Sequence, residues 1–553
     1  MCGIAGFIGV GDRDDITLMT DALKHRGPDG QGFHFDEENQ VFLGHRRLSI
    51  RDLKNGAQPM WDIQKKKAIV FNGEIYNDLE LRRELESLGY KFSSSHSDTE
   101  VLLYGYIHWG PRILEKLNGM FAFAILDYDQ QRLFLARDRF GEKPLYYCKK
   151  NDVFAFSSEL SSLVKHQYIA SEPSQKSLQK LFAYGFIPAP HSLYINTYKL
   201  PAGHFMHVDL KTLKSSQACY WDFELTNESS FCHSDEKELI EELETLIDTA
   251  VDRRLVSDVP IGLFLSGGVD SSTILSAASK SKKIDRPHTF TIGFEEASFD
   301  ESAFAKQVAQ QFHSIHRLET LNSFGAESTL HNILGQLDEP FADASILPTY
   351  QLCKFAKQHV TVALSGDGGD ELFAGYDPFK ALGPAVFYNT LIPKPLRFIL
   401  EKSVQKLPIS ENNMALDFKL KRTLIGLSQI ESCWAPAWMG PIDPREFSSY
   451  FTQHCKAEEL FSEAMELWDS TPSKSRVDKL LRYFTKLYLQ DNILFKSDRA
   501  SMMNSLETRA IFLDNDIVDF CSRLPTKYKM KFFKNKYLLK KGCGETYWKK
   551  DSQ

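Results

Sequence analysis

Two patterns of hydrophobic and polar positions divide the chain. Up to about residue 200, short apolar runs alternate with turns rich in Gly, Asn and Asp, which predicts β-strands. Amphipathic stretches at 77–88 and 98–108 predict two helices in the same region. The clearest predicted strands are at 41–43, 68–71, 121–127 and 132–136. The first part is therefore expected to be a β-rich domain of mixed structure.

The second pattern consists of longer helical stretches that alternate with short apolar strands. A helix at 236–254 leads into a strand at 261–265, and further strands are expected at 289–293 and 360–364. Strands separated by helices of this length favour a parallel sheet covered on both faces. About the last 180 residues are expected to be almost wholly helical.

Between the two patterns, residues 226–237 are mostly Asn, Ser, His, Asp and Glu, which is typical of a linker. We therefore expect a first domain at 1–215, a linker at 216–236 and a second domain at 237–553. A length of 553 residues agrees with this division, because it is long for one hydrophobic core.

Composition narrows the class of protein. A formal net charge of −7 disfavours a nucleic-acid partner. No run of about 18 apolar residues is present, so no membrane partner is expected. None of the nine cysteines is spaced as C-x-x-C, which argues against a zinc ribbon. Their odd number and the lack of a secretory segment favour a reducing, cytoplasmic location.

The chain begins with Met1 and Cys2, and removal of Met1 would give Cys2 a thiol beside a free α-amine. A free thiol is only a few per cent thiolate at neutral pH. An α-amine titrates near 7.7–8.0, so it can serve as the general base for its own thiol. Cys2 taken alone could also be a cysteine that merely follows the start codon.

Further motifs at 25–30, 47–50, 71–77 and 97–100 supply what an amide hydrolase for an amino acid needs. Arg47 can clamp an α-carboxylate with two hydrogen bonds. Asp98 can hold the α-ammonium, and Asn72 with Gly73 can donate to the oxyanion of the tetrahedral intermediate.

Together with Cys2, these segments resemble the class II glutamine amidotransferase domain, which has an N-terminal nucleophile fold of stacked antiparallel sheets with helices. The resemblance covers about the first 200 residues. It implies that Cys2 is the nucleophile and that Asn72 and Gly73 form the oxyanion hole. The glutamine-binding residues that it implies are Arg47, Leu48, Ser49, Ile50, Arg51, Asn72, Gly73, Glu74 and Asp98.

In the second domain, an apolar strand runs into the small residues at 266–272 and then into a helix. Backbone N–H groups at a helix N-terminus can cradle phosphate, and Asp270 can bind the accompanying Mg²⁺. The Walker A lysine is missing. A plain strand-to-helix turn would explain the glycines but not the flanking serines and aspartate. The loop resembles that of the N-type ATP pyrophosphatases, which split ATP into AMP and pyrophosphate.

A second polar turn, at 365–371, follows another apolar strand, and ligands of parallel sheets gather at such strand ends. The two turns resemble those of the asparagine synthetase family. The resemblance implies Mg²⁺ ligation by Asp270 and Asp370, and a role for Asp367 in forming an acyl-adenylate. The family often has glutamate at the position of Asp367, which leaves the role of the shorter side chain open. The implied ATP-binding residues are Leu265, Ser266, Gly267, Gly268, Val269, Asp270, Ser271, Ile292, Ser365 and Gly366.

Segments at 491–499 and 506–509 resemble the helical core signature of that family, and 511–514 matches its next motif without the proline. Lys536 and Lys540 lie where a G-K-x-x-L-[RK] segment is expected. The resemblance implies that Lys536 neutralises charge on the adenylate and on pyrophosphate. A surface charge in a Lys-rich tail is the other interpretation. The family normally continues for tens of residues beyond this segment.

The sequence therefore predicts a glutamine-dependent amide ligase: an α+β glutaminase domain followed by an α/β ATP-pyrophosphatase domain with a helical C-terminal region. The expected small-molecule substrates are glutamine, ATP and aspartate, and Mg²⁺ is the expected cofactor that accompanies ATP. A homodimer is left open. One alternative acceptor is another carboxylate, such as a sugar acid in polysaccharide synthesis. A non-catalytic or truncated relative is the second alternative, and a β-lactam synthetase-like cyclase fits less well because that group lacks a working glutaminase nucleophile.

Overall fold

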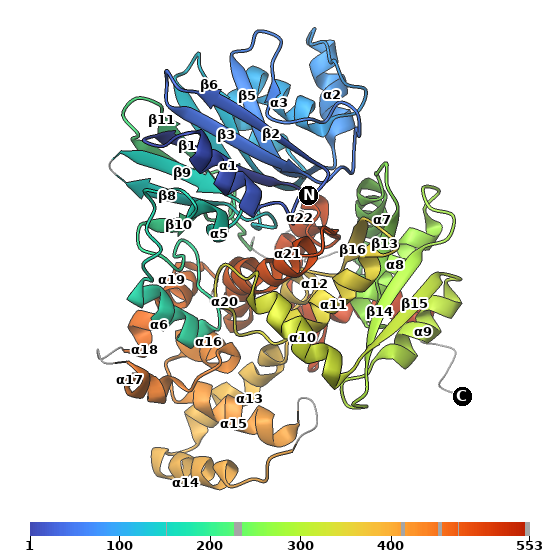
Figure 1. The fold of residues 1–553 in the computed structure, drawn as a ribbon. Helices are drawn as coiled ribbons and strands as arrows, with labels where there is room; N and C mark the ends of the chain where they lie inside the picture. The colour runs from blue at the N-terminus through green and yellow to red at the C-terminus, as the bar shows by residue number, and fades with distance from the viewer. Residues whose placement is uncertain (151, 226–234, 411–414, 452–455, 474, 548–553) are drawn as a thin grey trace.

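The computed structural model of the protein describes residues 1–150, 152–225, 235–410, 415–451, 456–473 and 475–547. In its first domain, two six-stranded antiparallel sheets stack face to face (Figure 1). The first sheet has the order β10-β8-β9-β1-β3-β2, and the second has the order β12-β11-β7-β6-β5-β4. The strands are β1 Gly3–Gly9, β2 Gly30–Asp36, β3 Val41–Arg47, β4 Met60–Trp61, β5 Lys67–Ile75, β6 Gly119–Asp127, β7 Arg132–Arg137, β8 Tyr146–Lys150, β9 Val153–Ser157, β10 Thr197–Lys199, β11 His204–Asp209 and β12 Ser215–Cys219.

Alternation along the strands builds three hydrophobic layers. On β5, Val70 faces the space between the sheets, while Ile69 and Phe71 face the helices that cover the second sheet. On β1, Ile4 faces the same inner layer and Phe7 packs under α1. The helices of this domain are α1 Arg13–Ala22, α2 Asp78–Ser87, α3 Asp98–Trp109, η1 Gly110–Arg112, α4 Ile113–Lys116, α5 Leu160–Leu163 and α6 Gln175–Tyr184. The stacked antiparallel sheets predicted from the sequence are confirmed.

The second domain is built on a parallel sheet with the order β15-β14-β13-β16-β17. Helices α7 and α8 pack on one face and α11 packs on the other, so the parallel sheet is covered as predicted. The strands are β13 Ile261–Phe264, β14 His288–Phe294, β15 Ile315–Leu321, β16 Val362–Ser365 and β17 Glu507–Ala510. The first helices are α7 Glu236–Arg254, α8 Val269–Lys280, α9 Ser302–Gln311, α10 Ser323–Leu334 and α11 Ile346–Lys357.

The remainder is mainly helical, as expected, but it contains one strand that the hydrophobic pattern does not reveal. Glu507–Ala510 forms β17 and pairs in parallel with β16, although the segment was expected to be helical. Its Glu507 and Arg509 are buried as ion pairs, so the strand lacks the apolar alternation that predicts one. The other elements are α12 Gly369–Leu372, α13 Asp377–Leu391, α14 Lys394–Gln405, α15 Leu416–Leu427, η3 Glu431–Cys433, α16 Trp434–Met439, η4 Pro444–Glu446, α17 Phe447–Tyr450, α18 Ala457–Leu460, α19 Ser462–Ser470, α20 Arg476–Tyr483, the π-helix η5 Phe484–Ile493, α21 Leu494–Met502, α22 Asn515–Arg523, α23 Thr526–Lys529, β18 Met530–Lys531, β19 Lys534–Asn535 and α24 Tyr537–Tyr547.

The two domains meet across buried charges as well as apolar side chains. Arg26 donates to both carboxylate oxygens of Asp498 at 2.8 and 2.9 Å, and both residues are buried. Beside this pair, Leu48 and Met120 of the first domain pack with Met502 of the second. Of the predicted linker, residues 226–234 lie outside the described ranges, and the domain boundaries stay predictions. Within the described part of the chain, no helix is long and apolar enough to cross a membrane.

Candidate functional site

A cavity of about 40 Å³ opens at the start of the chain, where β1, the loop after β3 and the N-terminus of α3 meet. It brings together most of the residues predicted to bind glutamine. Those on its wall are Cys2, Arg47, Leu48, Ile50, Arg51, Gly73, Glu74 and Asp98. Ser49 is not on this wall, and its backbone N–H donates to Asp29 at 2.7 Å.

Asn72 is held directly against the predicted nucleophile. The backbone N–H of Cys2 donates to Oδ1 of Asn72 at 2.9 Å, which fixes the orientation of the amide. Its Nδ2 is buried and has no hydrogen-bond partner among the described residues. At Gly73, a Cβ atom would lie 2.1 Å from the carbonyl oxygen of Met120, so no side chain fits between β5 and β6. A free amide donor and a bare backbone beside Cys2 suit an oxyanion hole.

Cys2 is half-buried in the wall of the cavity. Burial raises the pKa of the Cys2 thiol, and the nearby N-terminal ammonium and the backbone of Leu48 act against this rise. A thiol with a raised pKa needs a base to become a nucleophile. Met1 is itself buried, and its ammonium lies 2.6 Å from a carboxylate oxygen of Glu507. The second domain thus contributes a carboxylate to the cavity beside Cys2.

Arg47 shapes the rim of the cavity. Its guanidinium donates to the carbonyl oxygens of Arg51, Asp52 and Leu53, which holds the loop after β3 around it. A guanidinium has five N–H donors, so further donors remain for the carboxylate of a bound amino acid. Arg51 is different, because its guanidinium is occupied by Glu74 and Asp78. Arg47 therefore suits the carboxylate-clamping position better than Arg51 does.

Asp98 is a buried carboxylate that forms no ion pair with any residue in the described ranges, although it lies in the cavity wall. Burial raises its pKa, while the charge of Arg51 acts in the opposite direction. One oxygen accepts from the backbone N–H of Ile75 at 3.1 Å. Such a carboxylate is suited to receive a cation from a ligand, such as the α-ammonium of glutamine.

We expect Asp98→Ala to raise the KM for glutamine by more than about tenfold, while the KM for ATP stays unchanged. Removing one partner of a buried charge pair costs about 2–5 kcal/mol. Steady-state glutaminase kinetics would measure the effect, and Asp129→Ala, at an exposed position of the same domain, is the control. An unaltered KM for glutamine in Asp98→Ala would remove Asp98 from the ammonium site.

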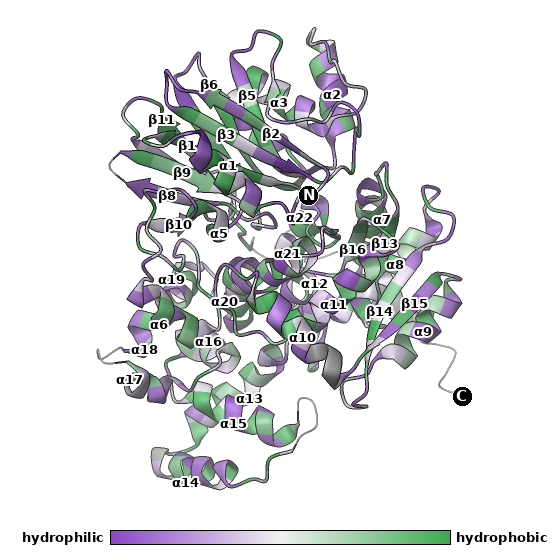
Figure 2. Ribbon diagram, viewed as in Figure 1, coloured by the Kyte–Doolittle hydropathy of each residue, from purple (hydrophilic) through white to green (hydrophobic). Residues whose placement is uncertain are grey.

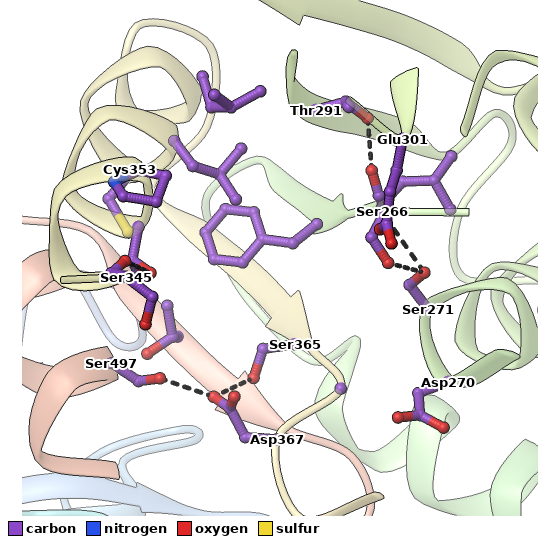
Figure 3. Close-up of a pocket in the computed structure, with 18 of the residues that line it drawn as sticks. Ser266, Asp270, Ser271, Thr291, Glu301, Ser345, Cys353, Ser365, Asp367 and Ser497 are labelled. Atoms are coloured by element: carbon purple, nitrogen blue, oxygen red, sulfur yellow. Dashed lines mark hydrogen bonds between the residues drawn. The ribbon is translucent and has the colours of Figure 1, made fainter. Parts of the chain in front are cut away.

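The second and larger cavity, of about 530 Å³, lies at the carboxyl ends of β13, β14 and β16 (Figure 3). Both predicted polar turns contribute to it. The predicted residues on its wall are Leu265, Ser266, Asp270, Ser271, Ile292, Ser365, Gly366 and Asp367. Gly267, Gly268 and Val269 are not on the wall; Gly268 is the N-cap of α8 and Val269 its first residue. This places the N-terminus of α8 beside the cavity, as phosphate binding requires.

Lys536 joins the two turns. Its ammonium lies 2.5 Å from Asp270 and 2.7 Å from Asp370. The turns are in close contact, since a Cβ atom on Gly369 would lie 2.8 Å from the carboxylate of Asp270. The interpretation of Lys536 as a solvated surface charge does not agree with this position, because the residue is buried between two carboxylates. The structure therefore brings together Asp270, Asp370 and Lys536, the three residues predicted to act on the phosphates of ATP.

The carboxylates fit the Mg²⁺ ion that the family resemblance implies. Oδ1 of Asp270 is buried and has no hydrogen-bond partner among the described residues, so it is free to bind a cation. No group of three or more His, Cys, Asp or Glu side chains that could hold a metal occurs in the described part of the chain. Nucleotide-bound Mg²⁺ needs only one or two carboxylates, because phosphates and water complete its shell.

Asp367 lies where the second cavity approaches the first domain. Its carboxylate accepts hydrogen bonds from Ser365 at 3.0 Å and from Ser497 at 2.9 Å (Figure 3). It also lines a small interdomain cavity with Glu142 and Lys143 of the first domain. Burial, together with the charge of Asp138, raises the pKa of Glu142 to about 8. The residue predicted to help form the acyl-adenylate thus faces the glutaminase side of the molecule.

Comparison with known proteins agrees with this two-part site. Residues 1–221 match the family model of a glutamine amidotransferase domain, and residues 242–545 match that of asparagine synthase. The chain belongs to the asparagine synthase family. Asparagine synthetase [glutamine-hydrolyzing] 1 of Bacillus subtilis (strain 168) is 34% identical over 98% of this chain and 84% of its own length. Putative asparagine synthetase [glutamine-hydrolyzing] 2 of Methanocaldococcus jannaschii is 35% identical over 91% of this chain and 98% of its own.

Among solved structures, glutamine phosphoribosylpyrophosphate amidotransferase from B. subtilis aligns with a TM-score of 0.31 and 16% identity, over 68% of this chain and 77% of that one. This overlap is too low to add to the assignment. As a member of the asparagine synthase family, the protein is a glutamine-hydrolysing, ATP-dependent amide ligase.

In this asparagine synthase family member, several residues line the cavities without having been predicted there. Glu507 and Lys496 lie in the segments 506–509 and 491–499 that resemble the family signature, but the sequence assigned them no role. Glu507 reaches the Cys2 cavity from β17, and Lys496 reaches the larger cavity from α21. Asp258 precedes β13 and accepts from the backbone N–H of Asp52 at 2.9 Å and pairs with His96 at 2.8 Å. Its own N–H donates to the carbonyl oxygen of Ile50 at 3.1 Å. The second domain therefore holds the loop that forms the rim of the glutamine cavity.

We expect Asp258→Ala to raise the KM for glutamine by about three- to tenfold and to leave ammonium-dependent synthesis unchanged, because the half-exposed pair contributes a modest free energy. Asp258→Asn keeps an acceptor for the Asp52 N–H and should show a smaller effect. Initial rates with glutamine and with ammonium would measure both. Equal losses with the two nitrogen donors would mean that Asp258 supports the fold in general rather than this loop.

Proposed function

We propose that the protein is a glutamine-dependent asparagine synthetase, in which Cys2 releases ammonia from glutamine and aspartate is amidated through an aspartyl-adenylate. The observation that carries the proposal is the pair of cavities on either side of one interface, with Asp367 lining both the larger cavity and the small interdomain cavity. The relatives named above carry the name asparagine synthetase, which favours aspartate as the acceptor.

In the first half-reaction, the Cys2 thiol attacks the carboxamide carbon of glutamine and its proton passes to the α-amine that removal of Met1 leaves on Cys2. The oxyanion accepts hydrogen bonds from Nδ2 of Asn72 and the backbone N–H of Gly73. Collapse of the intermediate expels ammonia and leaves a γ-glutamyl thioester, which water then hydrolyses to glutamate. Arg47 and Asp98 orient the substrate through its α-carboxylate and α-ammonium.

In the second half-reaction, the acceptor carboxylate attacks the α-phosphorus of ATP and pyrophosphate leaves. The N-terminus of α8 and Lys536 face the phosphates, and bound Mg²⁺ at Asp270 and Asp370 would supply Lewis-acid neutralisation of phosphate charge. Ammonia then attacks the acyl carbon and AMP leaves, with Asp367 placed to accept a proton from the attacking nitrogen. Lys496 lines the larger cavity, with its ammonium 2.8 Å from Oγ of Ser345 and 3.3 Å from a single carboxylate, that of Asp343. Its remaining N–H donor can bind the acceptor's α-carboxylate.

Product analysis with glutamine, ATP, Mg²⁺ and a panel of carboxylate acceptors tests the proposal. The expected products with aspartate are asparagine, glutamate, AMP and pyrophosphate. ADP and phosphate in place of AMP and pyrophosphate would overturn the adenylate mechanism. Amide formation with another carboxylate but not with aspartate would overturn the acceptor and keep the ligase chemistry.

A further inference from the structure

Helix α14 is oriented with its polar side toward the protein and its apolar side toward solvent. It lies at the end of the molecule farthest from the two stacked sheets, beyond α13 and α15 (Figure 1). None of its side chains that the structure describes is buried. A helix on the surface of a globular protein normally has the opposite orientation, with an apolar stripe against the core.

The inner side of α14 is held by polar contacts. Arg397 donates to the carbonyl oxygen of Ile392 and to that of Asn389, both at 2.6 Å. One turn later, Glu401 pairs with Arg445. Since Arg397 and Glu401 are four residues apart, they lie on the same side of the helix. These contacts fix which side of α14 remains uncovered.

The uncovered side is apolar. Leu396, Ile399 and Leu400 have the spacing of neighbours on one helical face, and they are 52%, 58% and 42% exposed. The adjoining helices add Leu391 and Leu416, which are 62% and 72% exposed. Hydrophobic residues occur along α13, α14 and α15 at this end of the molecule (Figure 2). Contiguous exposed apolar patches of this kind mark interaction sites on soluble proteins.

Charge indicates the chemical nature of the partner. Residues 377–427 contain eight Lys or Arg and four Asp or Glu, whereas the whole chain has a net charge of −7. Lys402 and Lys406 are exposed, and the Lys402 ammonium lies 4.4 Å from the centre of the Phe398 ring, itself 58% exposed. Apolar side chains flanked by lysines on a protruding helix suit a planar, anionic, partly apolar surface.

We propose that α14 and the apolar residues beside it form a docking surface for an anionic lipid bilayer. Leu396, Ile399 and Leu400 enter the boundary between head groups and acyl chains, and Lys402 and Lys406 contact lipid phosphates. The expectation of no membrane partner rested on the lack of a spanning segment, and a helix lying in the interface does not need one. The inference does not depend on the identity of the acceptor substrate, because neither the Cys2 cavity nor the larger cavity is lined by residues of α13, α14 or α15.

Co-sedimentation of the full-length protein with phosphatidylcholine vesicles, with and without phosphatidylglycerol, tests the proposal. We expect binding only when phosphatidylglycerol is present and a strong decrease of binding at high salt. Ile399→Ser with Leu400→Ser, and separately Lys402→Glu with Lys406→Glu, should each lower the bound fraction by about tenfold or more. Ammonium-dependent synthesis and the Tm should be unchanged in both variants, because these side chains are exposed.

Matched substitutions at exposed positions of the first domain provide the controls: Ile63→Ser for the apolar change, and Lys211→Glu with Lys214→Glu for the charge change. These variants should bind as the unmodified protein does. Failure of the unmodified protein to bind phosphatidylglycerol vesicles would overturn the proposal. A dimer by light scattering that becomes a monomer in the Ile399 and Leu400 variant, without vesicle binding, would also overturn it and assign the face to a second copy of this chain.

Discussion

Cys2→Ala is expected to lower glutamine-driven amide synthesis by about three orders of magnitude or more, while synthesis from ammonium continues at its normal rate. The thiol acts only on glutamine, and ammonia is the sole product that passes to the second site. Coupled assays of amide formation with glutamine and with ammonium chloride would measure the two rates separately.

The control is Cys219→Ala, which removes an exposed thiol of the same domain. It should retain both activities and its sensitivity at Cys2 to alkylating reagents. Parallel loss of both activities in Cys2→Ala would contradict the separation of the two half-reactions. Retention of the glutamine-driven rate would show that another group is the nucleophile.

Asp270→Asn is expected to lower ATP turnover by about two orders of magnitude or more and to leave glutaminase activity measurable. Replacing the carboxylate by an amide removes the charge proposed to bind Mg²⁺, which also pairs with Lys536 at 2.5 Å. The glutamine cavity is built from other elements and should be intact. Release of AMP, followed by chromatography, and release of glutamate from glutamine would measure the two effects.

Asp285→Asn, at an exposed position after α8, is the matched control and should turn over ATP normally. A second check is the dependence of the rate on Mg²⁺, because the Asp270 variant should need a higher concentration of the ion. If Asp270→Asn turned over ATP at the normal rate, the loop at 266–271 would not be the phosphate site. If the unmodified protein hydrolysed glutamine but consumed no ATP, the ligase proposal itself would be wrong for this chain.

The hydrophobic pattern was sufficient for most of the fold because most elements bury apolar side chains. The strands at 68–71 and 121–127 and the helix at 236–254 lie within or coincide with β5, β6 and α7. Strand β17 was missed because two of its buried side chains, Glu507 and Arg509, are charged and also pair with groups far away in the sequence, the Met1 ammonium and Glu74. Pairing of this kind depends on tertiary structure and leaves no local period.

The residues of the candidate site also fall into those that the sequence predicts and those that only the structure reveals. Cys2, Asp98 and Asp270 lie in short motifs whose residue types have a chemical reason to occur together, so they could be predicted. Glu507 and Asp258 each approach the Cys2 cavity from the other domain. Glu507 lies in the segment 506–509 that resembles the family signature, but neither residue has a local pattern that predicts contact with the first domain. The structure also separates Arg47 from Arg51, which the motif groups together, because one guanidinium keeps free donors and the other is neutralised by Glu74 and Asp78.

The contact between Arg26 and Asp498 has a consequence for the synthesis of the protein, because 472 positions separate its partners in the chain. A ribosome adds about 5–20 residues per second. Asp498 is therefore synthesised roughly 20 to 100 seconds after Arg26, and the ion pair cannot form before then. During that interval the nascent first domain presents a hydrated cation rather than an apolar surface at this point. Glu507 is synthesised later still. Its carboxylate can therefore join the Cys2 cavity only when synthesis of the ligase domain is almost complete.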